Sequence, residues 1–140
     1  MERKVMIRLQ GEQRYEHQEP DVIELTTEGL LRQEEGKLLL SYQETELTGL
    51  EGTTTSFEID GDRVTLRRTG AVDSCMEFSL GTVHKSLYET PMGALLVTVC
   101  ATRIVNHMDE TGGNLTVSYD ITIEELGMGQ IEYRLFVTPL

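Results

Sequence analysis

Residues 53–66 read Thr-Thr-Thr-Ser-Phe-Glu-Ile-Asp-Gly-Asp-Arg-Val-Thr-Leu. On both sides of Asp60-Gly61, apolar or β-branched residues alternate with polar ones. Strict alternation is typical of a β-strand with one buried face, and Asp-Gly favours a tight hairpin because both residues tolerate positive φ. The stretch therefore predicts two antiparallel strands joined by a short turn.

The same alternation continues in both directions along the chain. Its longest run is Leu95-Val97-Val99-Ala101, and further runs occupy residues 5–9, 23–27, 38–42, 76–78, 115–123 and 131–137. Glycine-containing turn signals separate the runs, and Gly29 and Gly81 inside strand-like stretches predict bulges or bends. Parallel strands need crossovers of a dozen or more residues, for which this chain has no room.

The pattern predicts one all-β domain over residues 1–140, an antiparallel up-and-down barrel of eight to ten strands with little or no helix. Closure into a barrel is expected because it removes the two edges of an open sheet. The predicted core comprises mid-strand residues on the more apolar faces: Leu66, Val97, Val99, Val117, Tyr119 and Ile121. Three tyrosines in phase with aliphatic residues are also expected to be core rather than ligand contacts: Tyr42, Tyr119 and Tyr133.

Charge and cysteine content narrow the class of protein. The net charge of −12, from 24 acidic and 12 basic residues, disfavours binding to nucleic acid or to an anionic membrane surface. No long apolar run follows the first residues, and Cys75 and Cys100 are too few for a disulfide framework or a zinc site. We therefore expect a cytoplasmic protein without metal or cofactor.

Several segments carry a resemblance to a known family. They are Tyr42-Gln43-Glu44-Thr45-Glu46, the Thr-rich strand after Gly52, and Tyr88-Glu89-Thr90-Pro91. With these segments the chain resembles, over nearly its whole length, the YwiB-like family of uncharacterised bacterial proteins. The resemblance implies a calycin-type barrel like that of the lipocalins. It implies no catalytic residues, because the family has no established activity.

Four charged residues share the phase of the apolar faces: Glu44, Glu46, Arg68 and Arg103. If residues 76–88 form one bent strand, these four side chains end alternate strands and gather at one mouth of the barrel. They would then form either a salt-bridged plug or a polar ligand site, in which arginine recognises a carboxylate or phosphate. A bulge that shifts the phase would instead place them in solvent.

Tyr88 and Glu89 begin a turn that Pro91 stiffens. The same two residues could form a rigid corner with a packed tyrosine, or they could lie on the rim of the opposite mouth as site residues.

Three classes of function follow from these patterns. The first is a module that binds a small, anionic molecule in or at the mouth of the barrel. The second is a protein-interaction module that uses a strand edge or an outer patch of Leu39, Leu96, Ile104 and Phe136. The third and least favoured is an enzyme, since the sequence holds no catalytic motif and His17, His84 and His107 are scattered. The sequence leaves the oligomeric state open, a homodimer included.

Overall fold

The structure, a computed structural model, describes residues 2–46, 49–71, 73–90, 93–124 and 127–140. Within these ranges the chain forms ten β-strands and no helix. The strands are β1 (Glu2–Tyr15), β2 (Asp21–Glu34), β3 (Lys37–Gln43), β4 (Thr53–Asp60), β5 (Arg63–Gly70), β6 (Ser74–Ser79), β7 (Val83–Thr90), β8 (Gly93–Asp109), β9 (Gly112–Ile123) and β10 (Gly127–Pro139).

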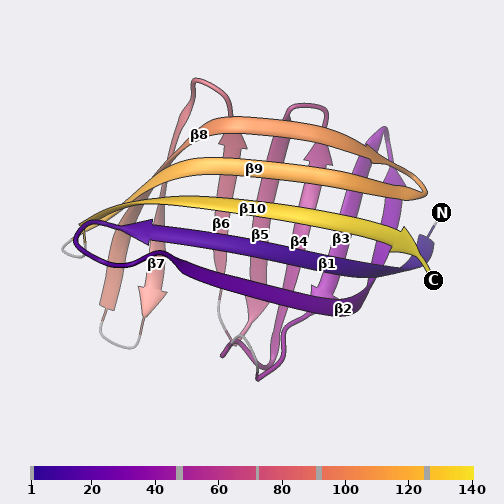
Figure 1. Cartoon of the computed structure of the whole chain (residues 1–140), viewed down its shortest axis with the longest axis horizontal. Coiled ribbons are helices and arrows are strands. Elements are labelled where there is room, and N and C mark those ends of the chain that lie inside the picture. Colours follow the sequence, from indigo (N-terminus) through magenta and orange to yellow (C-terminus); the bar gives the residue numbers. More distant parts are fainter. Residues whose placement is uncertain (1, 47–48, 72, 91–92, 125–126) are drawn as a thin grey trace.

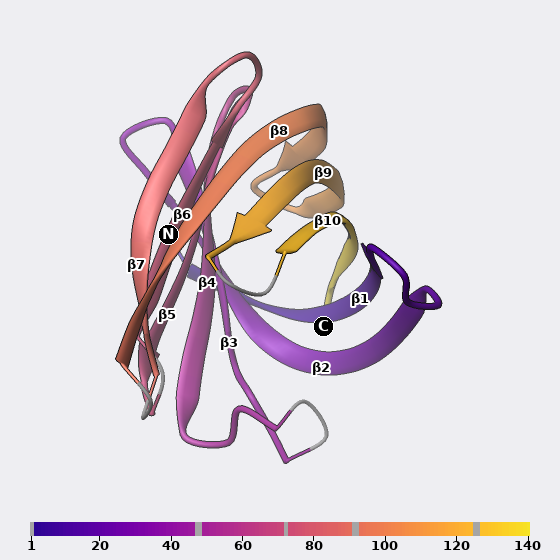
Figure 2. The same ribbon diagram turned by 90° about the vertical axis from the view of Figure 1, so that its left-hand side faces the viewer.

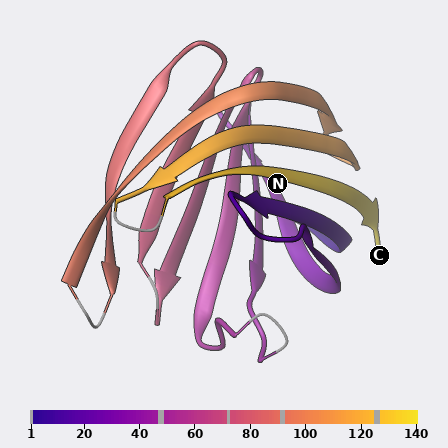
Figure 3. The same cartoon turned by 60° about the vertical axis from the view of Figure 1, so that its left-hand side comes forward.

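All neighbouring strands pair antiparallel, in the order β6-β5-β4-β3-β2-β1-β10-β9-β8-β7. Strands β8, β9, β10, β1 and β2 cross in front of β3 to β7 at a steep angle (Figure 1). Seen from the side, these two groups form layers that face each other across the interior (Figure 2), and the intermediate view in Figure 3 shows the sheet curling from one layer into the other. The predicted antiparallel barrel of eight to ten strands is confirmed, and the barrel is nearly closed.

The seam of the barrel lies between β6 and β7, the two ends of the strand order. In the described ranges no backbone ladder joins these strands. Instead, a side chain spans the seam: the backbone N–H of Glu77 donates to Nδ1 of His84 at 3.4 Å. The seam leaves the barrel wall less firmly connected here than between the laddered strands.

The expectation that residues 76–88 form one bent strand is wrong. The chain reverses after Ser79, whose carbonyl accepts from the N–H of Thr82 at 3.1 Å, and Gly81 adopts a φ of 77° in this turn. A short reversal of this kind favours glycine because positive φ is costly for other residues. As a result β7 ends at the same mouth as β5, and not at the opposite one.

The core follows from the register of the inward-facing residues. Leu38, Ile59, Val64 and Phe78 form one row across β3 to β6, and Leu40, Phe57, Leu66 and Met76 form the next. The six residues predicted as core are all buried, with exposures of 6% or less: Leu66, Val97, Val99, Val117, Tyr119 and Ile121. That prediction is confirmed, as is the burial of Tyr42.

Gly29 marks the place where β2 turns from one layer toward the other. Strand β2 pairs with β1 along most of its length, but with β3 only from Leu30 onward. A Cβ atom at Gly29 would lie 2.5 Å from Cδ1 of Ile7 and 2.6 Å from the carbonyl oxygen of Ser41. The absence of a side chain is therefore what allows the three strands to approach each other here.

Strand β8 contains a β-bulge between Ala101 and Arg103. The extra residue shifts the alternation, so that Ile104, paired with buried Val117, now packs against the core. Arg103 pairs with Ser118 and lies exposed on the outer surface. The predicted inward position of Arg103 is wrong for this reason.

At the end of the barrel where β4 and β5 are joined, the Asn106 side chain bridges the two layers. Nδ2 of Asn106 in β8 donates to the carbonyl of Gly61 in the β4–β5 turn at 2.8 Å. Oδ1 of Asn106 also accepts from the N–H of Met108 at 2.9 Å. The first of these bonds ties the two layers together at this end of the barrel, and the second fixes the Asn106 side chain within β8. Among the described residues, no helix has the length and apolar character needed to cross a bilayer.

Candidate functional site: a cavity and a buried polar cluster at one mouth

The interior changes from apolar to polar toward the mouth at which β3, β5 and β7 end. Beyond the row containing Leu66, the next inward row across β3 to β6 is Tyr42, Thr55, Arg68 and Ser74. One step further out, the N–H of Glu44 donates to the carbonyl of Thr53 at 2.8 Å. The alternation that builds the core therefore also directs these polar side chains inward.

Arg68 is the cation of this cluster. Burial works to lower the pKa of its guanidinium, but Tyr133, Tyr42 and Tyr119 around it outweigh burial and raise the pKa. Tyr133 acts both electrostatically and by accepting a side-chain hydrogen bond from the guanidinium. Arg68 therefore stays charged inside the barrel, as arginine does in proteins generally.

Glu44 is the anion of this cluster and is only 7% exposed. Burial raises the pKa of its carboxyl group, while Arg68, Thr55 and Tyr42 oppose that rise in decreasing order. Charge attraction links Arg68 and Glu44, but the pair forms no direct ion pair of the kind found between exposed residues such as Lys37 and Glu58. A carboxylate held this way is expensive to keep ionised.

The cluster is incompletely hydrogen-bonded. Four of its buried side-chain atoms have no hydrogen-bond partner of good geometry: Nε of Arg68, Oε1 of Glu44, Oγ1 of Thr53 and Oγ1 of Thr55. Thr55 is close enough to influence the Glu44 carboxyl, yet it is not aligned to donate to Oε1. Buried polar atoms in native proteins are nearly always paired, so a group of unpaired ones is typical of a site that a ligand or water completes.

Tyr119 and Tyr133 connect the cluster to the aromatic core. Their ring centroids lie 6.2 Å apart, and Tyr119 stacks at a tilt on Phe78 with centroids 4.4 Å apart. Burial raises the pKa of Tyr119 well above its ordinary value. The electrostatic influence of Tyr133 and a side-chain hydrogen bond with Tyr133 act in the same direction. Burial likewise raises the pKa of Tyr42. Both tyrosines are therefore neutral hydroxyl groups at physiological pH.

A cavity of about 210 Å³ lies beside Arg68 at the same mouth. It is lined by Arg68, Ser74, Met76, Ser86, Tyr88, Leu95, Val97, Ile121 and Ile123. The lining is largely apolar, and among its described residues Arg68 is the one that carries a charge. Arg68 therefore belongs both to the polar cluster and to the lining of the cavity.

The structure brings together some of the residues singled out from the sequence and separates others. Glu44, Arg68 and Tyr88 lie at one mouth, and Tyr88 shares the cavity with Arg68, so its expected place at the opposite mouth is wrong. Glu46 is exposed in the loop that follows β3, where its carbonyl accepts from the N–H of Gly49 at 3.2 Å. The side chain of Glu89 and the whole of Pro91 fall outside the described residues.

The patch expected for a protein partner is not formed as predicted. Of its members only Leu96 is exposed, since Ile104 packs on the core and Phe136 is half-buried beneath the Arg8 guanidinium, 5.1 Å from the ring centroid. Leu96 pairs instead with Leu87, which is 65% exposed, and Val83 lies further along the same strand.

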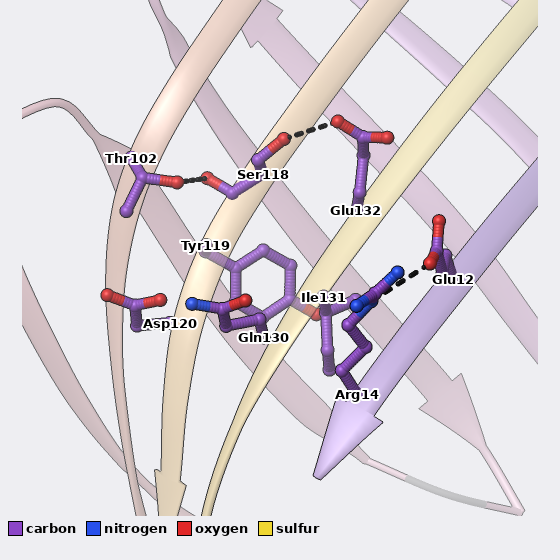
Figure 4. Close-up of a pocket in the computed structure, with 9 residues that line it drawn as sticks. All are labelled: Glu12, Arg14, Thr102, Ser118, Tyr119, Asp120, Gln130, Ile131 and Glu132. Carbon is purple, nitrogen blue, oxygen red and sulfur yellow. Dashed lines mark hydrogen bonds and ion pairs between the residues drawn. The ribbon is translucent and has the colours of Figure 1, made fainter. Parts of the chain in front are cut away.

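A larger, open depression of about 430 Å³ lies on the outer face over β8, β9, β10 and β1 (Figure 4). Several of its polar side chains are already paired within the chain: Ser118 Oγ donates to Glu132 at 2.9 Å, and Arg14 Nε lies 3.1 Å from Glu12. Glu132 also pairs with Arg134 at 2.9 Å. Because these paired groups are less available to a ligand than the unpaired atoms of Arg68 and Glu44, the mouth cavity is the stronger candidate site.

The comparisons with known proteins bear on family and fold. The crystal structure of the ywiB protein from Bacillus subtilis superposes with a TM-score of 0.80, at 21% sequence identity, over 96% of this chain and 92% of that one. No curated protein matches the chain. A family model described as a domain of unknown function, DUF1934, matches residues 7–135. The YwiB-like resemblance is confirmed, and the chain belongs to the DUF1934 family.

Proposed function

We propose that the protein is a binding module for a small molecule, held in the cavity at the mouth of the barrel. The observation that carries the proposal is an apolar cavity of about 210 Å³ lined by the half-buried Arg68, whose Nε atom is buried and has no hydrogen-bond partner. Apolar walls with a few placed polar groups are the usual composition of a ligand site. A cytoplasmic location is part of this proposal and suits the two free cysteines, Cys75 and Cys100.

The size of the cavity limits the ligand. A cavity of about 150 Å³ is enough to bind benzene, whereas drug-sized ligands occupy about 300–1,000 Å³. The cavity here, about 210 Å³, falls between these sizes. The ligand that fits without rearrangement therefore has on the order of eight non-hydrogen atoms.

A panel of fragments of this size, screened by ligand-observed NMR, tests the proposal. The Ser86→Phe variant serves as the blocked form, because Ser86 lines the cavity and pairs with inward Val97. The matched control is Ser56→Phe, at a half-buried position on the outward side of β4. We expect fragments to bind the wild type and Ser56→Phe but not Ser86→Phe. Binding that Ser86→Phe leaves intact would place the site elsewhere.

A second candidate function, binding to another protein, is favoured by a different observation. Val83, Leu87 and Leu96 are exposed on the outer side of β7 and β8, next to the unladdered edge of β7. An open strand edge flanked by apolar side chains is suited to receive an added strand. Pull-down experiments with the wild type and with a Leu87→Lys variant test this function. A partner protein that binds this face should be captured by the wild type and lost with Leu87→Lys.

A further inference from the structure

We propose that the cavity selects small aliphatic monocarboxylates, and that the bound carboxylate replaces Glu44 as the counter-ion of Arg68. The proposal rests on the proposed function and names the class of ligand and the exchange that accompanies its binding.

The walls of the cavity favour an aliphatic chain. Five of the lining side chains are apolar: Met76, Leu95, Val97, Ile121 and Ile123. They come from β6, β8 and β9, so that they surround the space from both layers of the barrel. Burying the methylene groups of a chain against them contributes about 0.8 kcal/mol for each CH₂ group.

The single charge favours a monoanionic, planar head group. Among the described residues of the lining, Arg68 is the one that carries a charge, and its Nε has no hydrogen-bond partner. A guanidinium fits a carboxylate with two parallel hydrogen bonds. A dianion such as phosphate would bring a second negative charge close to Glu44, with no second cation among the described residues of the lining. The hydroxyl groups of Ser74, Ser86 and Tyr88 remain to orient the carboxylate.

Glu44 makes the binding competitive. Glu44 is not among the residues that line the cavity, it attracts Arg68 without a direct ion pair, and its Oε1 is unpaired. When a second carboxylate reaches Arg68, the two negative charges repel each other and the buried Glu44 takes up a proton. Burial already raises the pKa of Glu44, which lowers the cost of that proton uptake.

Other titratable groups near Arg68 do not substitute for Glu44. Tyr42 from β3, Tyr119 from β9 and Tyr133 from β10 surround the guanidinium, and Tyr88 from β7 lines the cavity. Burial raises the pKa of Tyr42 and of Tyr119, so both hydroxyl groups stay protonated through the pH range of the test. His84 of β7 faces Glu77, with Nε2 of His84 3.7 Å from the carboxylate of Glu77. A control variant without His84 therefore shows whether this histidine contributes to proton uptake.

Isothermal titration calorimetry with hexanoate, hexan-1-ol and hexylammonium tests the class of ligand. We expect hexanoate to bind the wild type about tenfold or more tightly than hexan-1-ol, because a hydrogen bond to a charged group is stronger than a neutral one. The Arg68→Met variant should remove that preference. If Arg68→Met does not fold because Glu44 is left unpaired, the double variant Glu44→Gln/Arg68→Met gives the same readout without the buried charge.

The exchange with Glu44 is tested between about pH 5.5 and 8.5, where hexanoate stays ionised. Wild type should bind hexanoate with net proton uptake, measured from the dependence of the heat on buffer ionisation, and its affinity should fall as pH rises. Glu44→Gln should bind hexanoate more tightly at the upper end of this range and with no proton uptake. His84→Gln should keep the wild-type uptake.

The outcomes separate the inference from the proposed function. Equal binding of hexanoate and hexan-1-ol, or hexanoate binding that takes up no proton, would overturn the inference while leaving a ligand site in place. If none of the three probes nor any fragment of the panel binds the wild type, the proposed function itself is wrong.

Discussion

At the scale of single residues, the mouth of the barrel is unusual because its buried charges are close without being fully paired. Glu44 and Arg68 influence each other, yet Oε1 of the first and Nε of the second lack hydrogen-bond partners. A half-satisfied buried network costs stability compared with an apolar core. The arrangement is therefore better explained by a ligand than by stability.

The pH dependence of stability should show the cost of ionising Glu44. Burial, the largest influence, raises its pKa in the folded state. When the pKa of a carboxyl group is higher in the folded protein than in the unfolded chain, its contribution to stability is present below the pKa of the unfolded chain. That contribution is lost as the pH rises through the pKa of the folded protein. Glu44→Gln should therefore lose less unfolding free energy than wild type as pH rises from about 4 to 8. Urea melts measure this, and Glu46→Gln, exposed in the next loop, should behave like wild type.

The two arginines predicted for one mouth should differ in their effect on stability. Arg68→Met leaves the buried Glu44 without its cation and should cost about 3–5 kcal/mol near pH 8, and less at acid pH where Glu44 is protonated. Arg103→Met changes an exposed side chain beyond the β8 bulge and should stay within about 0.5 kcal/mol. Equal losses for both variants would contradict the placement of Arg68 in the interior.

At the scale of strands, the sequence predicts what depends on uninterrupted alternation. The apolar faces of β4, β5 and β9, and that of β8 up to Ala101, follow the predicted alternation because a period of two determines which residues face the core. Two local events were not predicted. The bulge lies within Ala101-Thr102-Arg103, a sequence that contains no glycine or other residue typical of a bulge. The turn after Ser79 lacks the Asp-Gly signal of the β4–β5 hairpin.

Those two events determine the site. The turn moves Tyr88 to the mouth of Arg68, and the bulge removes Arg103 from the interior. The serines of the cavity, Ser74 and Ser86, could not have been assigned from sequence, because they lie in strands whose ends the turn relocates. Tyr133 was correctly placed in the inward phase, but its contact with Arg68 depends on how β10 crosses β5.

The bend of β2 gives a prediction at the scale of an element. Gly29→Ala places a methyl group within 2.6 Å of a backbone oxygen and of an Ile7 methyl group, so that strands must move apart. The cost should be about 1–3 kcal/mol, as for other overpacked sites. Thr26→Ala, at an exposed position of the same strand, should change the unfolding free energy by about 0.5 kcal/mol or less. Similar urea midpoints for the two variants would show that β2 does not bend tightly at Gly29.

At the scale of the whole molecule, the sheet runs through all the described ranges and joins its first strand to its last through the β1–β10 ladder. That ladder ties the two ends of the chain together, so neither half has a sheet of its own. The sequence-based prediction of one domain over residues 1–140 is still to be tested.

One cooperative unfolding transition is the expected result of such a test. Methyl signals of Val64 in β5 and Leu135 in β10, both buried, should disappear with the same urea midpoint. The far-ultraviolet circular dichroism signal should follow the same curve. Separate midpoints for the two methyl groups would show that the layers unfold as independent units.

The central claim, that the mouth cavity holds a ligand, is tested most directly by methyl NMR during titration with hexanoate. Methyl signals of Ile121, Ile123 and Leu95, which line the cavity, should shift in the wild type and in Ser56→Phe, and stay fixed in Ser86→Phe. Those of Leu9 and Leu135, buried outside the cavity lining, should not move. Shifts confined to exposed Leu87 and Leu96, or no shift at saturating hexanoate and hexan-1-ol, would contradict the claim.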